Sequence, residues 1–262
     1  MPVRRRSGSP VTIAVLASRA PEAQRAAAEL SAMYDTVPAE EADVIVALGG
    51  DGFMLHVQAR HMNSGTPIYG MNKGTVGFLM NAYQPEGLLE RLETTVQERI
   101  HPLQMRVTDS YGQEHRGMAI NEVSLFRASA QAAKLSIEVD GRMRLQNLTC
   151  DGVMVATPQG STAYNLSAQG PILPLKSPLL ALTPVSPFRP RGWRGALLPN
   201  TSHVRIHVRD IEKRPVFAVA DHTEVRDAQL IDVHEDRDRT GLVLFDAADT
   251  WDERVLSEQF NA

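Results

Sequence analysis

The most constraining feature of this chain is an apolar strand that runs directly into a glycine-rich loop. Residues 43–48 form a short β-rich run, and the sequence Gly-Gly-Asp-Gly follows at residues 49–52. Such runs are typical of parallel strands that are covered on both faces. Because open α/β sheets bind ligands at the carboxyl ends of their strands, we expect a ligand site at this loop.

Strand and helix signals alternate through the first hundred residues. Residues 11–16 and 67–70 resemble strand 43–48, a helix is expected to begin at Pro21, and residues 53–62 are expected to form the helix that leaves the glycine loop. Residues 86–100 are amphipathic and predict a further helix. This order predicts a Rossmann-like α/β domain with a parallel sheet. The buried face of the helix from Pro21 is expected to contain Ala23, Ala26, Ala27, Leu30 and Met33.

The pattern changes after residue 100, where short strands and turn residues replace helical periodicity. Residues 137–143 contain an Asp-Gly pair that predicts a hairpin, and residues 203–209 alternate strictly. Residues 177–199 are rich in proline and are expected to form a long loop. The remaining expected strands are residues 216–220, 229–233 and 242–245.

These signals predict an α/β domain over residues 1–100 and a β-rich, antiparallel, sandwich-like domain over residues 101–245. Residues 246–262 are expected to form a C-terminal helix that packs on the first domain.

Composition limits the kinds of partner. The net charge is −4, and no apolar run approaches the roughly 20 residues of a membrane span, so neither nucleic acid nor a membrane is expected as a partner. The eight histidines lack metal-ligand spacing, so no metal site is predicted. The single cysteine, Cys150, fits a reducing compartment, and the expected location is the cytoplasm.

The chemistry of the glycine loop suits a phosphate group. Gly49 and Gly50 allow close approach of the backbone, and the free N–H groups at a helix start attract negative charge. Asp51 adds a carboxylate that could orient a hydroxyl group or hold Mg²⁺. A tight turn without function remains the alternative. The chain has neither the P-loop sequence nor a Gly-x-Gly-x-x-Gly fingerprint at its first strand–helix turn, which argues against P-loop enzymes and dehydrogenases.

A second polar cluster lies at residues 151–167. An apolar strand, residues 153–156, leads into a Thr-Pro-Gln-Gly turn, after which Ser161 is expected to cap a short helix. Hydroxyl and amide groups at that helix start suit a ligand with ribose or phosphate oxygens, and Tyr164 offers a ring for a flat base. The alternative is an ordinary capped helix with a buried tyrosine.

Several motifs in this order resemble those of the NAD kinase family. They are the Gly-Gly-Asp-Gly loop, the Asn121-Glu122 pair, the Asp151-Gly152 pair and the Thr-Pro-x-Gly-Ser-Thr-Ala-Tyr run of residues 157–164. Residues 70–79 are similar to that family's loop after the third strand. The similarity extends over roughly residues 43–225.

The resemblance implies transfer of the terminal phosphoryl group of ATP to the 2′-hydroxyl of the adenosine ribose of NAD, between an α/β domain and a β-rich domain. It implies a catalytic role for Asp51 and a phosphate loop at Gly49 and Gly50. The NAD-binding residues that it implies are Asp51, Gly52, Asn121, Glu122, Asp151, Ser161, Thr162, Ala163, Tyr164, Asn165, Leu166, Ser167, Asp221 and His222.

The resemblance also implies Mg²⁺ or another divalent metal with ATP, and a homodimer or homotetramer. Lys73, Arg127 and Lys134 are candidates for contact with phosphate, although solvated surface charges are the commoner use of such side chains. Three departures from the family pattern bear on the donor site: Phe53 replaces threonine, Thr75-Val76 replaces His-Leu, and Gln169 replaces glycine.

Two other functions stay open. Lipid kinases of the diacylglycerol type share the glycine–aspartate loop, but they do not account for residues 157–164. A noncatalytic NAD-binding regulator would keep the adenosine pocket without phosphoryl transfer, and the intact Asp51 argues against it.

Overall fold

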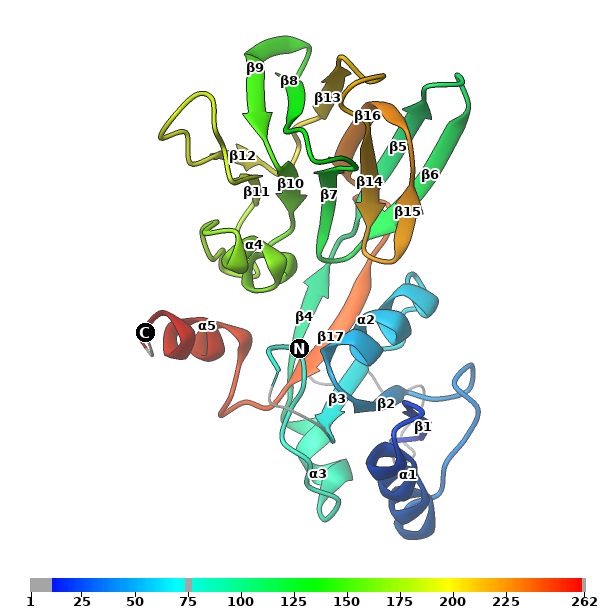
Figure 1. Cartoon of the computed structure of the whole chain (residues 1–262). Coiled ribbons are helices and arrows are strands. Elements are labelled where there is room, and N and C mark those ends of the chain that lie inside the picture. The colour runs from blue at the N-terminus through cyan, green and yellow to red at the C-terminus, as the bar shows by residue number, and fades with distance from the viewer. Residues whose placement is uncertain (1–10, 74–76, 261–262) are drawn as a thin grey trace. The chain divides into compact units, whose positions relative to one another are not determined.

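The computed structural model describes residues 11–73 and 77–260, which form two compact units (Figure 1). The first unit combines the chain up to Ile100 with the segment from Arg239 onward, and the second comprises His101–Asp238. Thr75 and Val76, two of the departures from the family pattern, lie outside the described residues.

The first unit is built on a five-stranded sheet with the order β1-β2-β3-β17-β4, as far as the described residues show. Neighbouring strands run parallel from β1 to β17, and β4 is antiparallel to β17. The elements are β1 (Ile13–Ala17), α1 (Pro21–Met33), β2 (Val44–Gly49), α2 (Asp51–Arg60), β3 (Ile68–Asn72), α3 (Leu88–Glu93), β4 (Val96–Ile100), β17 (Gly241–Phe245) and α5 (Trp251–Phe260).

The first strands and helices agree with the sequence patterns because their apolar residues are the ones that the fold buries. Every residue of β2 is buried, as expected for a central parallel strand. Helix α1 has Pro21 at its start and buries Ala23, Ala26 and Leu30. Met33, which was expected on the same face, is 46% exposed because the helix ends there.

The helix predicted over residues 86–100 is wrong in its second half. Helix α3 ends at Glu93, and the chain continues as strand β4 on the edge of the sheet. Leu88 and Leu92 are fully buried, whereas Thr94 leaves the helical conformation. Val96 and Ile100 pair with β17, so pairing across the sheet decides the conformation of a segment that also has helical periodicity.

The second unit is a sandwich of two six-stranded antiparallel sheets within the described residues. One sheet has the order β12-β11-β10-β7-β14-β15 and the other β6-β5-β16-β13-β8-β9. Their inner faces share one hydrophobic core, to which Val123 and Val153 contribute from the first sheet and Leu103 and Ile206 from the second. The strands are β5 (Leu103–Asp109), β6 (Glu114–Ala119), β7 (Glu122–Arg127), β8 (Ala133–Val139), β9 (Arg142–Cys150), β10 (Gly152–Ala156), β11 (Leu179–Val185), β12 (Ala196–Pro199), β13 (Val204–Arg209), β14 (Val216–Ala220), β15 (Thr223–Val225) and β16 (Ala228–Glu235).

Two short helical turns follow β10: the 3₁₀ turn η1 (Gln159–Thr162) and the helix α4 (Tyr164–Ser167). The predicted hairpin is confirmed, since β8 and β9 are joined by Asp140 and Gly141 with positive φ angles of 53° and 73°. The loop expected over residues 177–199 is wrong in part. It contains β11, a central strand of its sheet, and β12.

The expected domain boundary at residue 245 is wrong. Strand β17 pairs with β3 and β4 in the first unit, and the second unit ends at Asp238. The C-terminal helix α5 belongs to the first unit, as predicted, and buries Trp251 against Phe78 and Phe245. The parallel first sheet and the antiparallel second unit confirm the predicted fold class. None of the helices in the described chain has the length and apolar character needed to cross a membrane.

Candidate functional site

The carboxylate of Asp51 is held in a fixed orientation in the first unit. Asp51 is the first residue of α2, directly after the carboxyl end of β2. Its Oδ2 accepts a hydrogen bond of 2.9 Å from the N–H of Phe78, and its Oδ1 accepts one of 3.1 Å from the N–H of Leu79. A Cβ atom at Gly77 would lie less than 3.0 Å from this carboxylate, so only glycine permits the approach. Each carboxylate oxygen therefore has a backbone donor and a remaining lone pair.

The segment that binds Asp51 is anchored by the C-terminal helix. Arg254 of α5 donates a hydrogen bond of 2.7 Å to the carbonyl oxygen of Phe78 and one of 3.0 Å to Oδ1 of Asn81. The side chain of Asn81 in turn donates to the carbonyl oxygens of Gly70 and Leu244, on β3 and β17. Arg254 is 9% exposed and forms an ion pair of 2.9 Å with Asp249. A cavity of about 400 Å³ lies beside these residues and is lined by Asn72, Gly77, Phe78, Asp249, Arg254 and Ser257, among others.

Among the described residues, none lies close above Gly50 or Gly52 at the start of α2. A Cβ atom built on Gly50 or Gly52 has no described neighbour within 4 Å. These positions are free to admit a ligand closely, and the first N–H groups of α2 face outward at the helix start. Gly49 differs, because a Cβ there would meet the ring of Phe53.

In the second unit, the Asn121-Glu122 pair is fixed by Asp221. Glu122 is the first residue of β7, and Asp221 follows the neighbouring strand β14. Asp221 accepts hydrogen bonds of 2.6 Å from the N–H of Ile120 and 3.2 Å from that of Asn121. Oε2 of Glu122 is buried and has no hydrogen-bond partner among the described residues. Burial, and then the nearby carboxylate of Asp221, raises the pKa of Glu122 to about 7.

The turn after β10 binds the backbone of Ile120 and Asn121. Thr157 donates from Oγ1 to the carbonyl oxygen of Ile120 at 2.7 Å and from its N–H to that of Asn121 at 2.9 Å. A Cβ at Gly160 would lie less than 3.0 Å from the backbone of Asn121. The structure therefore brings together Asn121, Glu122, Asp221 and the turn at Thr157 and Gly160, which are far apart in the sequence.

The predicted cap at Ser161 is wrong. Ser161 lies inside η1, and its Oγ accepts a hydrogen bond of 2.9 Å from the N–H of Leu173. Asn165 is fully buried and bonds the carbonyl oxygens of Ser161 and Pro171 and the hydroxyl of Thr183. Both side chains support the turn from within and present no surface to a ligand.

The other predicted contacts are more accessible. Tyr164 is 39% exposed and packs against Phe126 with the ring centroids 5.6 Å apart. Ser167 and His222 are exposed, and Thr162, Ala163 and Leu166 are partly buried. Asp151 is partly exposed and accepts a hydrogen bond of 2.6 Å from Nε of Arg127.

The three basic candidates all have partners. Arg127 pairs with Asp151, and Nζ of Lys134 lies 2.9 Å from Oδ2 of Asp210. Nζ of Lys73 lies 3.4 Å from the ring centroid of Tyr83. Arg254 was not predicted from the sequence, although its place between Trp251 and Val255 on the inner side of an amphipathic helix was a signal for it.

Two protein-family models match this chain. The model of the ATP-NAD kinase N-terminal domain matches residues 12–100, and that of the ATP-NAD kinase C-terminal domain matches residues 120–235. The chain belongs to the NAD kinase family. The NAD kinase of Rhizobium meliloti is 56% identical over 95% of this chain and 97% of its own length. That of Caulobacter vibrioides is 54% identical over 95% of this chain and 96% of its own length.

Solved structures of NAD kinase family members share the fold. Yeast NADH kinase, solved with NADH, has a TM-score of 0.80 and 22% identity, over 97% of this chain and 89% of its own. An NAD kinase from Archaeoglobus fulgidus, solved with ATP, has a TM-score of 0.72 and 25% identity, over 95% of this chain and 98% of its own.

Proposed function

We propose that this chain is an NAD kinase that transfers the terminal phosphoryl group of ATP to the 2′-hydroxyl of the adenosine ribose of NAD. The observation that carries the proposal is that this member of the family has a preorganised polar feature in each of its two units. One is the carboxylate of Asp51 at the glycine loop, and the other is the Asn121-Glu122 pair fixed by Asp221.

Asp51 is the catalytic residue in this proposal. Phosphoryl transfer has a loose transition state, so an enzyme gains most by positioning the reactants and neutralising charge. The two backbone N–H groups hold the carboxylate of Asp51 in one orientation before the substrate binds. Its free lone pairs can then orient the ribose hydroxyl and accept the proton of that hydroxyl late in the transfer.

The ribose and base contacts are proposed on the second unit. Asn121 and Glu122 bind the adenosine ribose hydroxyls, and Asp151, Asp221 and His222 border the dinucleotide. Thr162, Ala163, Tyr164, Leu166 and Ser167 surround the adenosine, with the exposed ring of Tyr164 available to a flat base. Ser161 and Asn165 act by holding this turn rather than by contact, because they are fully buried.

The donor phosphates are proposed at Gly49, Gly50 and Gly52. The space above Gly50 and Gly52, which no described residue fills, admits a phosphate near the start of α2. The described residues contain no group of three side chains suited to hold a metal ion. Mg²⁺ that is bound with ATP needs only one or two carboxylates in addition to phosphates and water. Asp51 is the residue that would hold it, and the ion would neutralise phosphate charge.

We further propose a cytoplasmic homodimer or homotetramer, as implied by the family resemblance. A lipid kinase is disfavoured, because both matched domain models are those of ATP-NAD kinases. A noncatalytic regulator is disfavoured by the ordered carboxylate of Asp51.

The deciding experiment supplies the purified chain with NAD, ATP and Mg²⁺ and measures NADP with a coupled dehydrogenase. We expect NADP from the wild type and at least roughly a hundredfold less from Asp51→Ala, the size typical of a lost catalytic proton acceptor. Equal, trace-level NADP from both proteins would contradict the kinase proposal. Tight NAD binding by calorimetry in that case would identify a regulator instead.

A further inference from the structure

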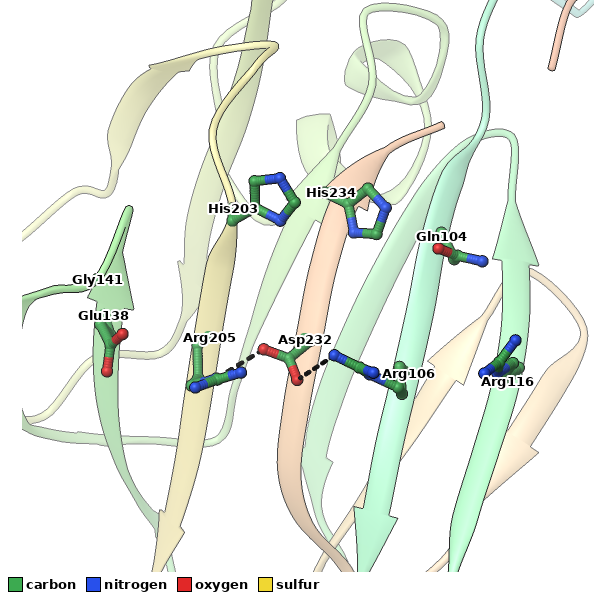
Figure 2. A pocket seen from close by; sticks show the side chains of 9 residues that line it. All are labelled: Gln104, Arg106, Arg116, Glu138, Gly141, His203, Arg205, Asp232 and His234. Carbon is green, nitrogen blue, oxygen red and sulfur yellow. Dashed lines mark hydrogen bonds and ion pairs between the residues drawn. The ribbon is translucent and has the colours of Figure 1, made fainter. Parts of the chain in front are cut away.

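A second polar cavity lies on the second unit, on the outer face of the sheet β6-β5-β16-β13-β8-β9 (Figure 2). Its volume is about 420 Å³, which is within the range of small-molecule sites. The inner face of the same strands packs into the hydrophobic core. The side chains that alternate with these core residues therefore point into the cavity on the other face. Its charged and ionisable lining includes Arg106, Arg116, Arg205, Asp232, His203 and His234.

The strand register places two arginines side by side without an intervening carboxylate. Arg116 on β6 lies directly opposite Arg106 on β5, and Arg106 lies opposite Asp232 on β16. Like charges that face each other across two strands are unfavourable. This arrangement leaves a site of positive potential at the β5–β6 side of the cavity.

The carboxylate of Asp232 already interacts with both Arg205 and Arg106. Asp232 accepts a hydrogen bond of 2.7 Å from Nε of Arg205, and its other oxygen lies 3.6 Å from Nη2 of Arg106. Glu138, the other acid in the lining, lies 3.5 Å from His207. Among the described residues, no hydrogen bond or ion pair engages the guanidinium of Arg116, and Figure 2 shows this side chain beside Arg106 with no dashed line to a neighbour.

Two histidines complete the wall of the cavity. The rings of His203 and His234 stack with centroids 4.6 Å apart. Burial, and then the adjacent His203, lowers the pKa of His234, with Arg106 acting in the same direction and Asp236 and Asp232 against it. Even a neutral imidazole has one N–H to donate.

We propose that this cavity binds a compact phosphate anion with at least two negative charges, of the inorganic diphosphate class. Planar guanidinium groups bind two phosphate oxygens at once, and an anion between Arg106 and Arg116 would remove their mutual repulsion. Among the described residues that line the cavity, the aromatic rings are those of His203 and His234, which already stack on each other, and this favours an inorganic chain over a nucleotide. This site is separate from the residues assigned to phosphoryl transfer.

The test uses the full chain and inorganic diphosphate, followed by the histidine ring resonances in NMR at low ionic strength. The resonances are assigned with His234→Gln, and the binding constant is measured by calorimetry. We expect diphosphate to shift the His203 and His234 resonances and to raise the pKa of His234, so that affinity increases as pH falls. Absence of any shift at these two histidines would overturn the proposal, and this measurement on the wild type needs no variant to fold.

The matched variants are Arg106→Gln/Arg116→Gln and Arg144→Gln, the latter on β9 of the same sheet and outside the cavity lining. We expect the double variant to bind diphosphate at least roughly tenfold more weakly, since charge-assisted hydrogen bonds are lost, and Arg144→Gln to bind as the wild type does. Equal weakening in both would indicate a general charge effect and overturn the site.

Two further experiments test the other possible occupants of the cavity, which are a nucleotide and a second copy of the chain. AMP is titrated against the same resonances, and a stronger response to AMP than to diphosphate would overturn the choice of an inorganic anion. Sedimentation of the double variant is compared with that of the wild type. A lower mass would overturn the proposal, because it would show that this face joins two copies of the chain.

Discussion

The guanidinium of Arg254 donates a hydrogen bond of 2.7 Å to the carbonyl oxygen of Phe78. The N–H of the same Phe78 binds the carboxylate of Asp51 at 2.9 Å. Arg254 therefore positions the carboxylate of Asp51 without contacting it. The backbone of Phe78 links the two, because its carbonyl oxygen binds Arg254 and its N–H binds Asp51.

Arg254→Ala is expected to lower kcat by about tenfold and to destabilise the first unit, because the carbonyl oxygen of Phe78 loses its donor and Oδ1 of Asn81 keeps only the N–H of Asp246. The KM for NAD should change less than about twofold, since the substitution acts through Asp51 and leaves the second unit untouched. Steady-state kinetics and thermal melting check both. Arg254→Lys should recover part of kcat, and the exposed Arg25→Ala is the control. A loss of stability with unchanged kcat would limit Arg254 to a structural role.

Gly77→Ala and Gly50→Ala are expected to impair catalysis in different ways, the first by lowering kcat and the second by raising the KM for ATP. A Cβ at Gly77 would collide with the Asp51 carboxylate, so kcat should fall by at least about tenfold. A Cβ at Gly50 meets open space in the described chain, so stability should change by less than about 1 kcal/mol while the KM for ATP rises. Kinetics with varied ATP, together with urea unfolding, distinguish the two. An unaltered KM for ATP in Gly50→Ala would argue against a phosphate at that glycine.

Glu122 is expected to make stability depend on pH. Burial and Asp221 raise the pKa of Glu122 from 4.5 to about 7, so the folded state holds a proton that the unfolded state releases. The stabilising contribution is present below pH 4.5 and is lost as pH rises to about 7, by on the order of 2–3 kcal/mol. Glu122→Gln should therefore gain stability relative to the wild type over this range. Urea midpoints of both proteins measure the difference, and a difference that is flat with pH would contradict the prediction.

Cys150 is expected to be unreactive in the folded protein. It is fully buried at the end of β9, and burial is the main cause that raises the pKa of its thiol to about 12. The native protein at pH 8 should not react with a thiol reagent such as dithionitrobenzoate on the timescale of minutes, whereas the urea-unfolded chain should react at once. Rapid labelling of the native protein would show that the strand opens locally.

The glycine loop and the strand before it were predictable because their signals are local. A fully apolar run such as residues 44–48 suits a strand with both faces covered, and Asp51 directly after it must lie at the carboxyl edge of the sheet. The hairpin at Asp140 and Gly141 was predictable for the same reason, since the two residues accept the positive φ angles that the turn requires.

Segments whose conformation depends on distant partners were not predictable in this way. Residues 96–100 have helical periodicity, yet they form an edge strand because β17, far along the chain, offers a partner. Strand β11 lies in a proline-rich stretch and still pairs with both β10 and β12, because its pairing with β12 ends at Leu182 and Pro184 lies beside β10 alone.

By itself, the sequence determined the family and the fold class, since these depend on motifs and on periods that neighbouring residues set, and it supplied the residues of the proposed site. Only the tertiary structure decided how those residues are held. Arg254 and Phe78 are 176 positions apart in the sequence, and Asp221 and Asn121 are 100 apart. The facing residues Arg106 and Arg116 lie on neighbouring strands. Hydrogen bonds and strand register act through space, and no local pattern in the chain records which distant groups they join.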